Sequence, residues 1–155
     1  MPPTIIREGP FGEGSLQLFV AADFEQHYFT LYEGRADLHD ALRRMCAFDV
    51  LANNTDRKSG HCLLGLDGRI YGIDHGLCFA EDFKLRTVIW EFGGERVPDD
   101  VLQDVGRVAD CVPLEVATLL DDEEVAALQR RAGALVDRGS FPIDTSGHRY
   151  PWPLV

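Results

Sequence analysis

The sequence predicts an α+β domain, with short strands in its first half and mostly helices in its second. Short apolar runs separated by glycine turns occur over residues 4–20 and 62–73, whereas apolar residues recur at helical spacing over 37–52 and 98–139. Neither a continuous strand–helix–strand rhythm nor an all-β pattern is present. A chain of 155 residues fits one domain with a core of its own.

The charge of the chain excludes some kinds of partner. The net charge is −11, whereas nucleic-acid binding needs a concentrated positive surface and binding to anionic membranes needs a local basic patch. No stretch approaches the roughly 18 consecutive apolar residues of a membrane helix, and residues 1–4 do not resemble the start of a signal peptide. We therefore expect a cytoplasmic protein with no integral membrane segment and no nucleic-acid partner.

The first elements expected are two strands on either side of a turn over Gly9 to Gly14. The second strand would run from Ser15 to Ala21. A phosphate-binding loop is disfavoured here, because no Gly-Lys-Ser/Thr ending is present and an extended segment, rather than a helix, follows. A hairpin turn is the better interpretation. Residues 24–35 lack a clear period and are expected to be irregular.

A helix is expected over Asp37 to Ala52, and it leads the chain into a polar loop over 53–61. Its apolar stripe consists of Leu38, Ala41, Leu42, Met45, Phe48 and Leu51. Two strands, 62–66 and 69–73, then flank Asp67-Gly68, which is a strong signal for a two-residue hairpin turn.

The rest of the chain is expected to be mainly helical. Residues 88–92 form an apolar run that fits either a strand or a buried loop. Helices are then expected from Pro98, over 113–120, and from Asp121 or Asp122 to Gly139, with Val136 among the residues spaced for burial. The Pro-rich tail, 141–155, is expected to pack over the helices as an extended strap.

Three polar residues around the central hairpin form the best candidate site. Asp56 lies in the loop beside Arg57 and Lys58, whose charges favour its ionised form, so it could accept a proton from a hydroxyl group. His61 follows five residues later and could bind a metal or donate a hydrogen bond. Asp74 lies thirteen residues further on, at the end of the second strand, and suits a hard divalent cation.

A zinc site is a second interpretation of the same hairpin, because His61, Cys62, His75 and Cys78 lie near it. We consider it the weaker one. Cys62 would point to the strand face opposite His61, and the sequence has no Cys-x-x-Cys pair. In a cytoplasmic chain the four cysteines are expected to be free thiols.

The spacing of these residues is similar to that of kinases, which place a catalytic Asp, a metal-binding Asn and a metal-binding Asp in this order. Asn54-Thr55-Asp56-Arg57, followed by Ile73-Asp74-His75-Gly76-Leu77-Cys78-Phe79, resembles the phosphatidylinositol 3-/4-kinase family. Within it, the sequence is most similar to type II phosphatidylinositol 4-kinases and to bacterial, mainly actinobacterial, kinase-like proteins. Residues 84–90 and the closing 150–153 resemble the bacterial group in particular.

The resemblance extends from about Thr4 to the C-terminus and implies the carboxy-terminal lobe of a kinase-like domain. Residues 1–22 would be the hinge-side strands, and 37–155 the helical lobe, with the catalytic hairpin over 53–76. The implied activity is transfer of the γ-phosphoryl group of ATP to a hydroxyl group of a lipid, small molecule or protein, with Mg²⁺ or Mn²⁺.

The resemblance also assigns roles to individual residues. Asp56 and the adjacent Arg57 would be catalytic, and Asp74 would bind the metal with His61 in place of the usual Asn. The adenine site would have Leu63 and Ile73 as its floor and Phe19, Val20 and Ala21 as a hinge strand that contacts the base through its backbone. Lys84 and Arg86 would meet an anionic substrate.

The sequence departs from the family pattern at its amino-terminal end. No glycine-rich phosphate cover is evident, and the first sixteen residues contain no lysine. We therefore expect an amino-terminal lobe that is largely missing, whether truncated, lost or omitted by a late start codon. The alternative function is a catalytically inactive module that binds nucleotide and metal or interacts with proteins. Apolar surface near Phe19, Leu63 and Ile73 would then favour self-association or a separate partner chain that supplies the lobe.

Overall fold

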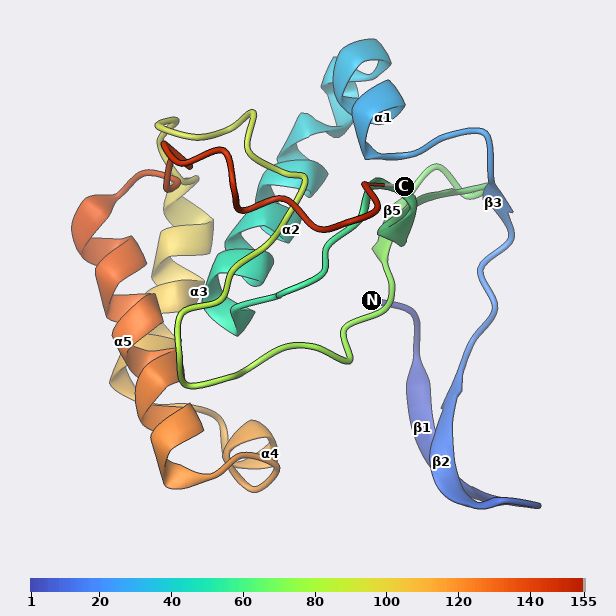
Figure 1. Cartoon of the computed structure of the whole chain (residues 1–155), viewed down its shortest axis with the longest axis horizontal. Coiled ribbons are helices and arrows are strands. Elements are labelled where there is room, and N and C mark those ends of the chain that lie inside the picture. Colours follow the sequence, from blue (N-terminus) through green and yellow to red (C-terminus); the bar gives the residue numbers. More distant parts are fainter. Residues whose placement is uncertain (155) are drawn as a thin grey trace.

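The computed structural model describes residues 1–154, and it has the predicted α+β composition (Figure 1). Two short antiparallel sheets and a helical body make up the fold. In chain order the elements are β1 Thr4–Gly9, β2 Gly12–Gln17, β3 Ala22–Asp23, α1 Tyr28–Gly34, η1 Ala36–Leu38, α2 His39–Ala52, η2 Ser59–His61, β4 Cys62–Gly65, β5 Ile70–Gly72, α3 Asp99–Asp110, α4 Leu114–Ala117 and α5 Asp122–Arg138.

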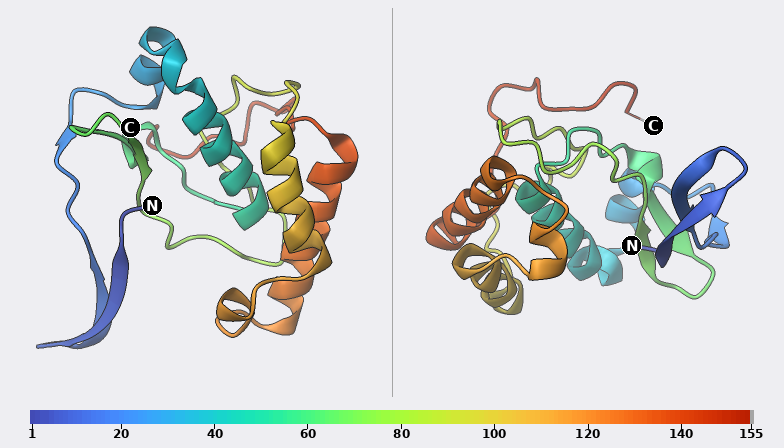
Figure 2. Two further views of the ribbon diagram at one scale, coloured as in Figure 1. Left: turned by 180° about the vertical axis from the view of Figure 1, so that it is seen from behind. Right: turned by 90° about the horizontal axis from the view of Figure 1, so that it is seen from below.

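The helical body consists of α2, α3 and α5, with α3 and α5 packed side by side (Figures 1 and 2). The sequence delimits α5 sharply. The Asp121 carboxylate accepts the backbone N–H of Glu124 at 2.8 Å, and the Glu124 carboxylate accepts the backbone N–H of Asp121 at 3.1 Å. Two backbone N–H groups at the start of α5 are therefore hydrogen-bonded. Gly139 ends the helix at φ 64°, which suits glycine best.

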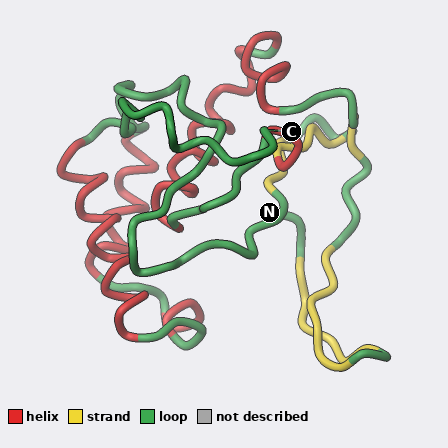
Figure 3. Tube along the Cα trace, viewed as in Figure 1, coloured by secondary structure: helices red, strands yellow, loops and turns green. Residues whose placement is uncertain are grey.

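The second sheet has the order β3-β4-β5, and the chain reverses at Asp67-Gly68 as expected. The connection is longer than the predicted two-residue turn, because β4 ends at Gly65 and β5 begins at Ile70 rather than at residues 66 and 69. The loops that surround it make up much of the molecule between sheet and helices (Figure 3). The tail is an extended strap, as predicted, but its backbone hydrogen bonds are to this loop region rather than to the helices that it was expected to cover. Its Arg149 carbonyl accepts the backbone N–H of Thr87 at 3.1 Å, and its Leu154 carbonyl accepts that of Ser59 at 2.8 Å.

The β1–β2 hairpin projects away from the helical body (Figures 1 and 2). All residues of both strands are exposed, including Ile5 and Ile6. The strand expected over Ser15 to Ala21 instead begins at Gly12 and ends at Gln17. Residues 18–21 form an extended link to β3, because after Gln17 the chain leaves β1 and joins the edge of the second sheet.

Four further expectations need correction or sharpening. Residues 24–35 are not irregular, because α1 forms there and buries Tyr28, whose hydroxyl donates to Glu91 at 2.6 Å. The helix expected over 113–120 shortens to α4 of four residues. Residues 88–92 form a loop in which Val88, Ile89 and Phe92 are buried and Glu91 is exposed, and Val136 is exposed on α5. Within residues 1–154, no helix combines the length and the apolar character needed to cross a bilayer.

Candidate active site

The polar loop begins where α2 ends, at Asn53. This residue has φ 54°, in the left-handed region, and its buried side chain fastens the segment after the hairpin. Its amide nitrogen donates to the carbonyls of Ala80 at 2.9 Å and Asp82 at 2.6 Å, and its amide oxygen accepts the backbone N–H of Lys84 at 2.9 Å. Asn53 therefore connects the entry of the loop to residues 80–84.

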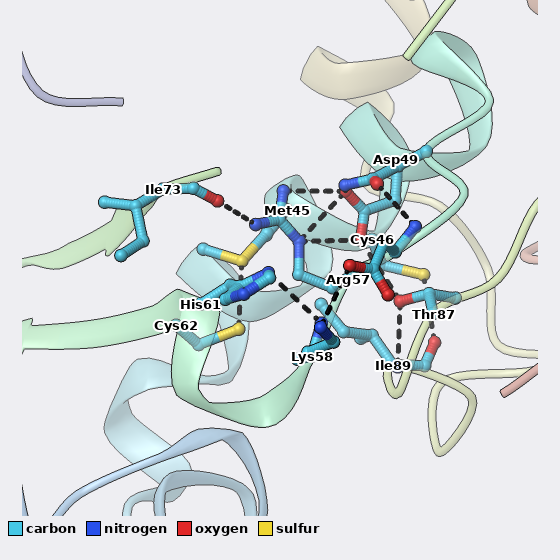
Figure 4. A network of polar contacts seen from close by, with 12 residues as sticks. Met45, Cys46, Asp49, Arg57, Lys58, His61, Cys62, Ile73, Thr87 and Ile89 are labelled. Carbon is cyan, nitrogen blue, oxygen red and sulfur yellow. Dashed lines mark hydrogen bonds and ion pairs between the residues drawn. The ribbon is translucent and has the colours of Figure 1, made fainter. Parts of the chain in front are cut away.

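A buried ion pair between Asp49 of α2 and Arg57 of the loop lies beneath the site (Figure 4). Both side chains are 0% exposed, and the guanidinium contacts the carboxylate through Nη2 at 2.8 Å and through Nε at 3.0 and 3.1 Å. Asn54 and Thr87 donate to the same carboxylate at 3.0 and 3.1 Å. Burial alone would lower the pKa of Arg57, but the Asp49 charge outweighs it and raises the pKa, so the guanidinium stays charged.

We call Asp49, Asn54, Arg57 and Thr87 the polar hub. It holds both candidate carboxylates by their backbones. The Asn54 amide oxygen accepts the N–H of Asp56 at 3.0 Å. Arg57 Nη1 donates at 2.9 Å to the carbonyl of Ile73 (Figure 4), the residue before Asp74. The assignment of Arg57 to the catalytic residues therefore needs correction. A fully buried guanidinium has no surface to offer a substrate, and Arg57 instead contacts Asp49 and the carbonyl of Ile73.

Asp74 follows β5 in a strained backbone conformation. Its φ is 55°, which is uncommon for a residue other than glycine and is often found at functional sites. Its side chain is 61% exposed, and the nearer carboxylate oxygen lies 3.5 Å from Nε2 of His61. The structure thus brings His61 and Asp74 together and leaves the carboxylate open to a ligand.

The position of His61 limits what its ring can do. The backbone N–H of Lys58 donates to Nδ1 at 3.4 Å, so Nδ1 carries no proton and the neutral ring bears its proton on Nε2, toward Asp74. Burial lowers the pKa of His61, and the nearby charge of Asp74 opposes this effect only in part. The lowered pKa keeps the ring neutral near pH 7. In this tautomer Nε2 is a donor and has no lone pair for a metal.

Asp56 lies on the same loop as a half-buried carboxylate beside Lys58. The ammonium of Lys58 is 3.1 Å from Asp56 Oδ2, and both side chains are partly open to solvent. The negative charges of Asp74 and Asp56 both act to raise the pKa of His61, so the three predicted residues are close enough to interact electrostatically. The sequence analysis used Lys58 only as a neighbouring charge, but the structure adds it to the residues of the site.

A hollow of about 380 Å³ lies between the β2–β3 link and the hairpin, close to these polar groups. Four of the five residues assigned to the adenine site line it, together with Gly60: Phe19, Val20, Leu63 and Ile73. Ala21 does not. It borders a separate hollow, and its carbonyl accepts the N–H of Leu66 at 2.9 Å, so it pairs with the sheet instead.

The two residues expected to contact substrate lie on the segment after the hairpin. Lys84 and Arg86 are exposed, and Lys84 lies 3.6 Å from Asp82. The backbone of Arg86 pairs with the loop on both sides: its N–H donates to Asn54 at 2.9 Å and its carbonyl accepts the N–H of Arg57 at 3.1 Å. Arg86 therefore lies alongside the loop that carries Asp56.

The sequence analysis missed the members of the polar hub other than Arg57. Asp49 offered the clearest signal, because it stands among Met45, Cys46 and Val50 of α2, all of which are buried. A carboxylate on a helix face that enters the core requires a buried cation as partner. Thr87 carried no comparable signal, because Asp49 lies 38 residues before it in the sequence. Asn54 is only five residues from Asp49, but a polar residue in a polar loop does not stand out.

The zinc interpretation has little support in the geometry. Cys62 is buried with its sulfur 3.3 Å from that of Met45, and burial raises its pKa to about 12, so its thiol faces the core. No group of three or more His, Cys, Asp or Glu side chains within residues 1–154 is placed to hold a metal ion. A metal at this site would need further ligands from a substrate or from water.

Comparisons with known proteins agree with the kinase-like spacing. Residues 7–130 match the family described as phosphatidylinositol 3- and 4-kinase. Protein Rv2133c of Mycobacterium tuberculosis is 40% identical over 190 residues, covering 99% of this chain and 68% of that protein. No solved structure matches significantly. The fold is therefore of the kinase-like class. The chain belongs to the phosphatidylinositol 3- and 4-kinase family.

Proposed function

We propose that this chain carries the acceptor- and metal-facing half of a phosphotransferase site that moves the γ-phosphoryl group of ATP to a hydroxyl group. The observation that supports this most strongly is the shared anchoring of two carboxylates. Asp56 is attached to the buried hub through its own backbone N–H and Asp74 through the carbonyl of the preceding Ile73, yet both side chains remain accessible. Preorganised groups of this kind are what phosphoryl transfer requires of a protein.

In the proposed reaction, Asp56 orients the acceptor hydroxyl and takes its proton as the oxygen bonds to the γ-phosphorus. The bond from that phosphorus to the bridging oxygen breaks, and ADP leaves with the electron pair. Lys58, 3.1 Å from Asp56, is placed to offset negative charge on the transferred group. Adenine would lie in the hollow formed by Phe19, Val20, Leu63 and Ile73, and Arg86 would face an anionic acceptor.

The donor set fits a Mg²⁺ or Mn²⁺ ion held mainly by Asp74. Mg²⁺ is usually bound by one or two carboxylates plus phosphate oxygens and water, so a single open carboxylate suffices. The ion would neutralise the charge of the phosphate oxygens. His61 fits the role of ligand less well, because Nδ1 accepts from Lys58. We therefore assign His61 to the orientation of Asp74.

The alternative is an inactive module that binds nucleotide and metal, and one observation favours it. The chain has two lysines, Lys58 and Lys84, and neither lies on the strands that precede α1. Active kinases use a strand lysine to hold the phosphates. Under this alternative, the chain alone would not turn ATP over. Turnover would require a second chain that binds next to the exposed β1–β2 hairpin.

The test combines titration calorimetry with Mn²⁺ and ATP and a turnover assay against inositol lipids, small alcohols and protein acceptors. We expect Asp74→Ala to weaken metal-dependent ATP binding and Asp56→Ala to abolish turnover while binding persists. Asp104→Ala, an exposed carboxylate on α3, serves as the matched control. Binding without turnover in the unaltered protein would favour the inactive module, and unchanged binding in Asp74→Ala would contradict the site itself.

A further inference from the structure

A second hollow, of about 300 Å³, lies on the far side of α2 from the β4–β5 hairpin, between α2, α5 and residues 81–83. Its walls are mostly apolar and come from Val50, Phe83, Ala127, Leu135 and Pro142. It shares no lining residue with the proposed nucleotide hollow. Its volume is in the range of pockets that hold small organic ligands.

Three arginines of α5 line the same hollow: Arg130, Arg131 and Arg138. Among the residues that the structure describes, none of the three forms an ion pair with a carboxylate. Most cations elsewhere in this part of the chain do, including Arg35, Arg43, Arg44, Arg57, Arg96 and Arg107. Glu81 is the one carboxylate on the rim of the hollow. In a chain with a net charge of −11, this is an unusual gathering of unpaired positive charge.

Arg131 makes the most specific contribution. Its Nε donates to the carbonyl of Leu51, at the end of α2, at 2.9 Å, and its Nη1 donates to that of Ala80 at 3.1 Å. Its Nη2 is buried and has no hydrogen-bond partner. Burial and the nearby Arg130 lower the pKa of Arg131, so no neighbouring group relieves the charge. A buried donor left unpaired is costly, and an acceptor that enters the hollow would remove this cost.

We propose that this hollow binds a small organic anion, in which a phosphate or carboxylate group is attached to an apolar body. The forked guanidinium groups suit both kinds of oxyanion, and such charge-assisted contacts are stronger than neutral hydrogen bonds. The aromatic ring of Phe83 and the aliphatic walls suit the apolar body. Arg130 and Arg138 supply the charge at the opening, and Arg131 supplies the buried donor.

The test uses phenyl phosphate as the probe in metal-free buffer of low salt, with binding measured by titration calorimetry. We expect one site per chain, weaker binding of inorganic phosphate, and no binding of benzyl alcohol at the same concentrations. Arg130→Ala and Arg138→Ala should each weaken binding by about three- to tenfold. Arg7→Ala, which removes an exposed charge from the β1–β2 hairpin, is the matched control and should change nothing.

Two more measurements separate this hollow from the proposed active site. Asp74→Ala should leave phenyl phosphate binding intact, and saturating ATP with Mn²⁺ should not compete with it. Equal binding in Arg130→Ala, Arg138→Ala and the unaltered protein would overturn the proposal, as would loss of binding in Asp74→Ala. A phenyl carboxylate, benzoate, in place of the phosphate then tells which anion the hollow prefers. Circular dichroism of each variant verifies that α5 is intact.

Discussion

Residues 49–57 and residues 4–17 are held in place by different kinds of interaction. The first segment carries Asp49, Asn54 and Arg57, which are fully or almost fully buried and bonded to one another. The second forms the β1–β2 hairpin, whose strands pair only with each other and whose residues are all exposed. An isolated two-stranded hairpin is marginally stable at best in water.

This difference bears on function, because Gln17 of the hairpin lines the proposed nucleotide hollow, whereas the hub holds the loop that carries Asp56. The hub fixes the backbones of Asp56 and Asp74, so the carboxylates are in place before any ligand arrives. The hairpin side, where a kinase would hold the phosphates, has neither a lysine nor a packed core of its own. Under the proposed function, the side that carries Asp56 and Asp74 would be anchored to the packed body, and the side expected to hold the phosphates would not be.

The largest expected effect comes from breaking the hub at Asp49. Asp49→Ala leaves the Arg57 charge buried without a partner, and we expect the free energy of unfolding to fall by about 3–5 kcal/mol. Urea denaturation measures this loss. The matched control is Asp37→Ala, which breaks the exposed ion pair with Arg35 and should cost far less, because solvent screens that pair. Similar losses in both variants would show that burial does not distinguish the hub.

Thr87→Val tests the hub at a neutral member. The change keeps the shape of the side chain but removes the hydroxyl that donates to Asp49 at 3.1 Å and accepts the N–H of Ile89 at 3.0 Å. Leaving these buried groups unpaired should cost about 1–3 kcal/mol in urea denaturation. Thr118→Val, at an exposed position after α4, is the control. A loss no larger than that of the control would mean that Asp49 is satisfied without Thr87.

The same contrast explains which parts of the structure could be predicted from the sequence. The helices α2, α3 and α5 and the β4–β5 hairpin were predictable, because helical periodicity, the Asp121 cap and the Asp67-Gly68 turn are local signals. The helix α1 was not, because its burial of Tyr28 depends on the distant residue Glu91. A contact between residues so far apart in the chain cannot be predicted from local sequence patterns.

The candidate site divides in the same way. The spacing of Asp56, His61 and Asp74 was enough to predict that these residues share one loop and hairpin, and the structure brings His61 and Asp74 within 3.5 Å. The burial of Arg57 was not predictable from its position beside Asp56, because its partner is on α2. Likewise, the tautomer of His61 depends on a backbone N–H whose direction only the folded loop defines.

The pH dependence of stability offers a smaller effect, centred on His75 near the hub. Burial, together with the Arg57 charge, lowers the pKa of this half-buried ring to about 4. Because the unfolded chain takes up the proton more readily, stability is retained above about pH 6.5 and declines as the pH falls toward 4. The loss should be about 1–2 kcal/mol, allowing for solvent screening. Urea denaturation at pH 7 and pH 4.5 measures it.

His75→Gln should make the stability less dependent on pH over this range, and His148→Gln, in the exposed tail, should not. Part of the dependence will remain in His75→Gln, because burial also lowers the pKa of His61 and its effect has the same sign. An unchanged slope in His75→Gln would place the titrating group elsewhere.

The smallest expected effect compares one substitution at two isoleucines. Ile89 is 1% exposed, beside the hub residue Thr87, whereas Ile6 is 67% exposed on the β1–β2 hairpin. Ile89→Val should lower the free energy of unfolding by about 0.5–1.5 kcal/mol, because the methylene group leaves a small cavity in a packed core. Ile6→Val should leave it unchanged within about 0.5 kcal/mol, because the group it loses is already in water. A measurable cost at Ile6 would mean that the hairpin is covered in solution, by a second copy of the chain or by the rest of the molecule. Dilution of the protein would distinguish the two, because only a contact between copies weakens as the protein concentration falls.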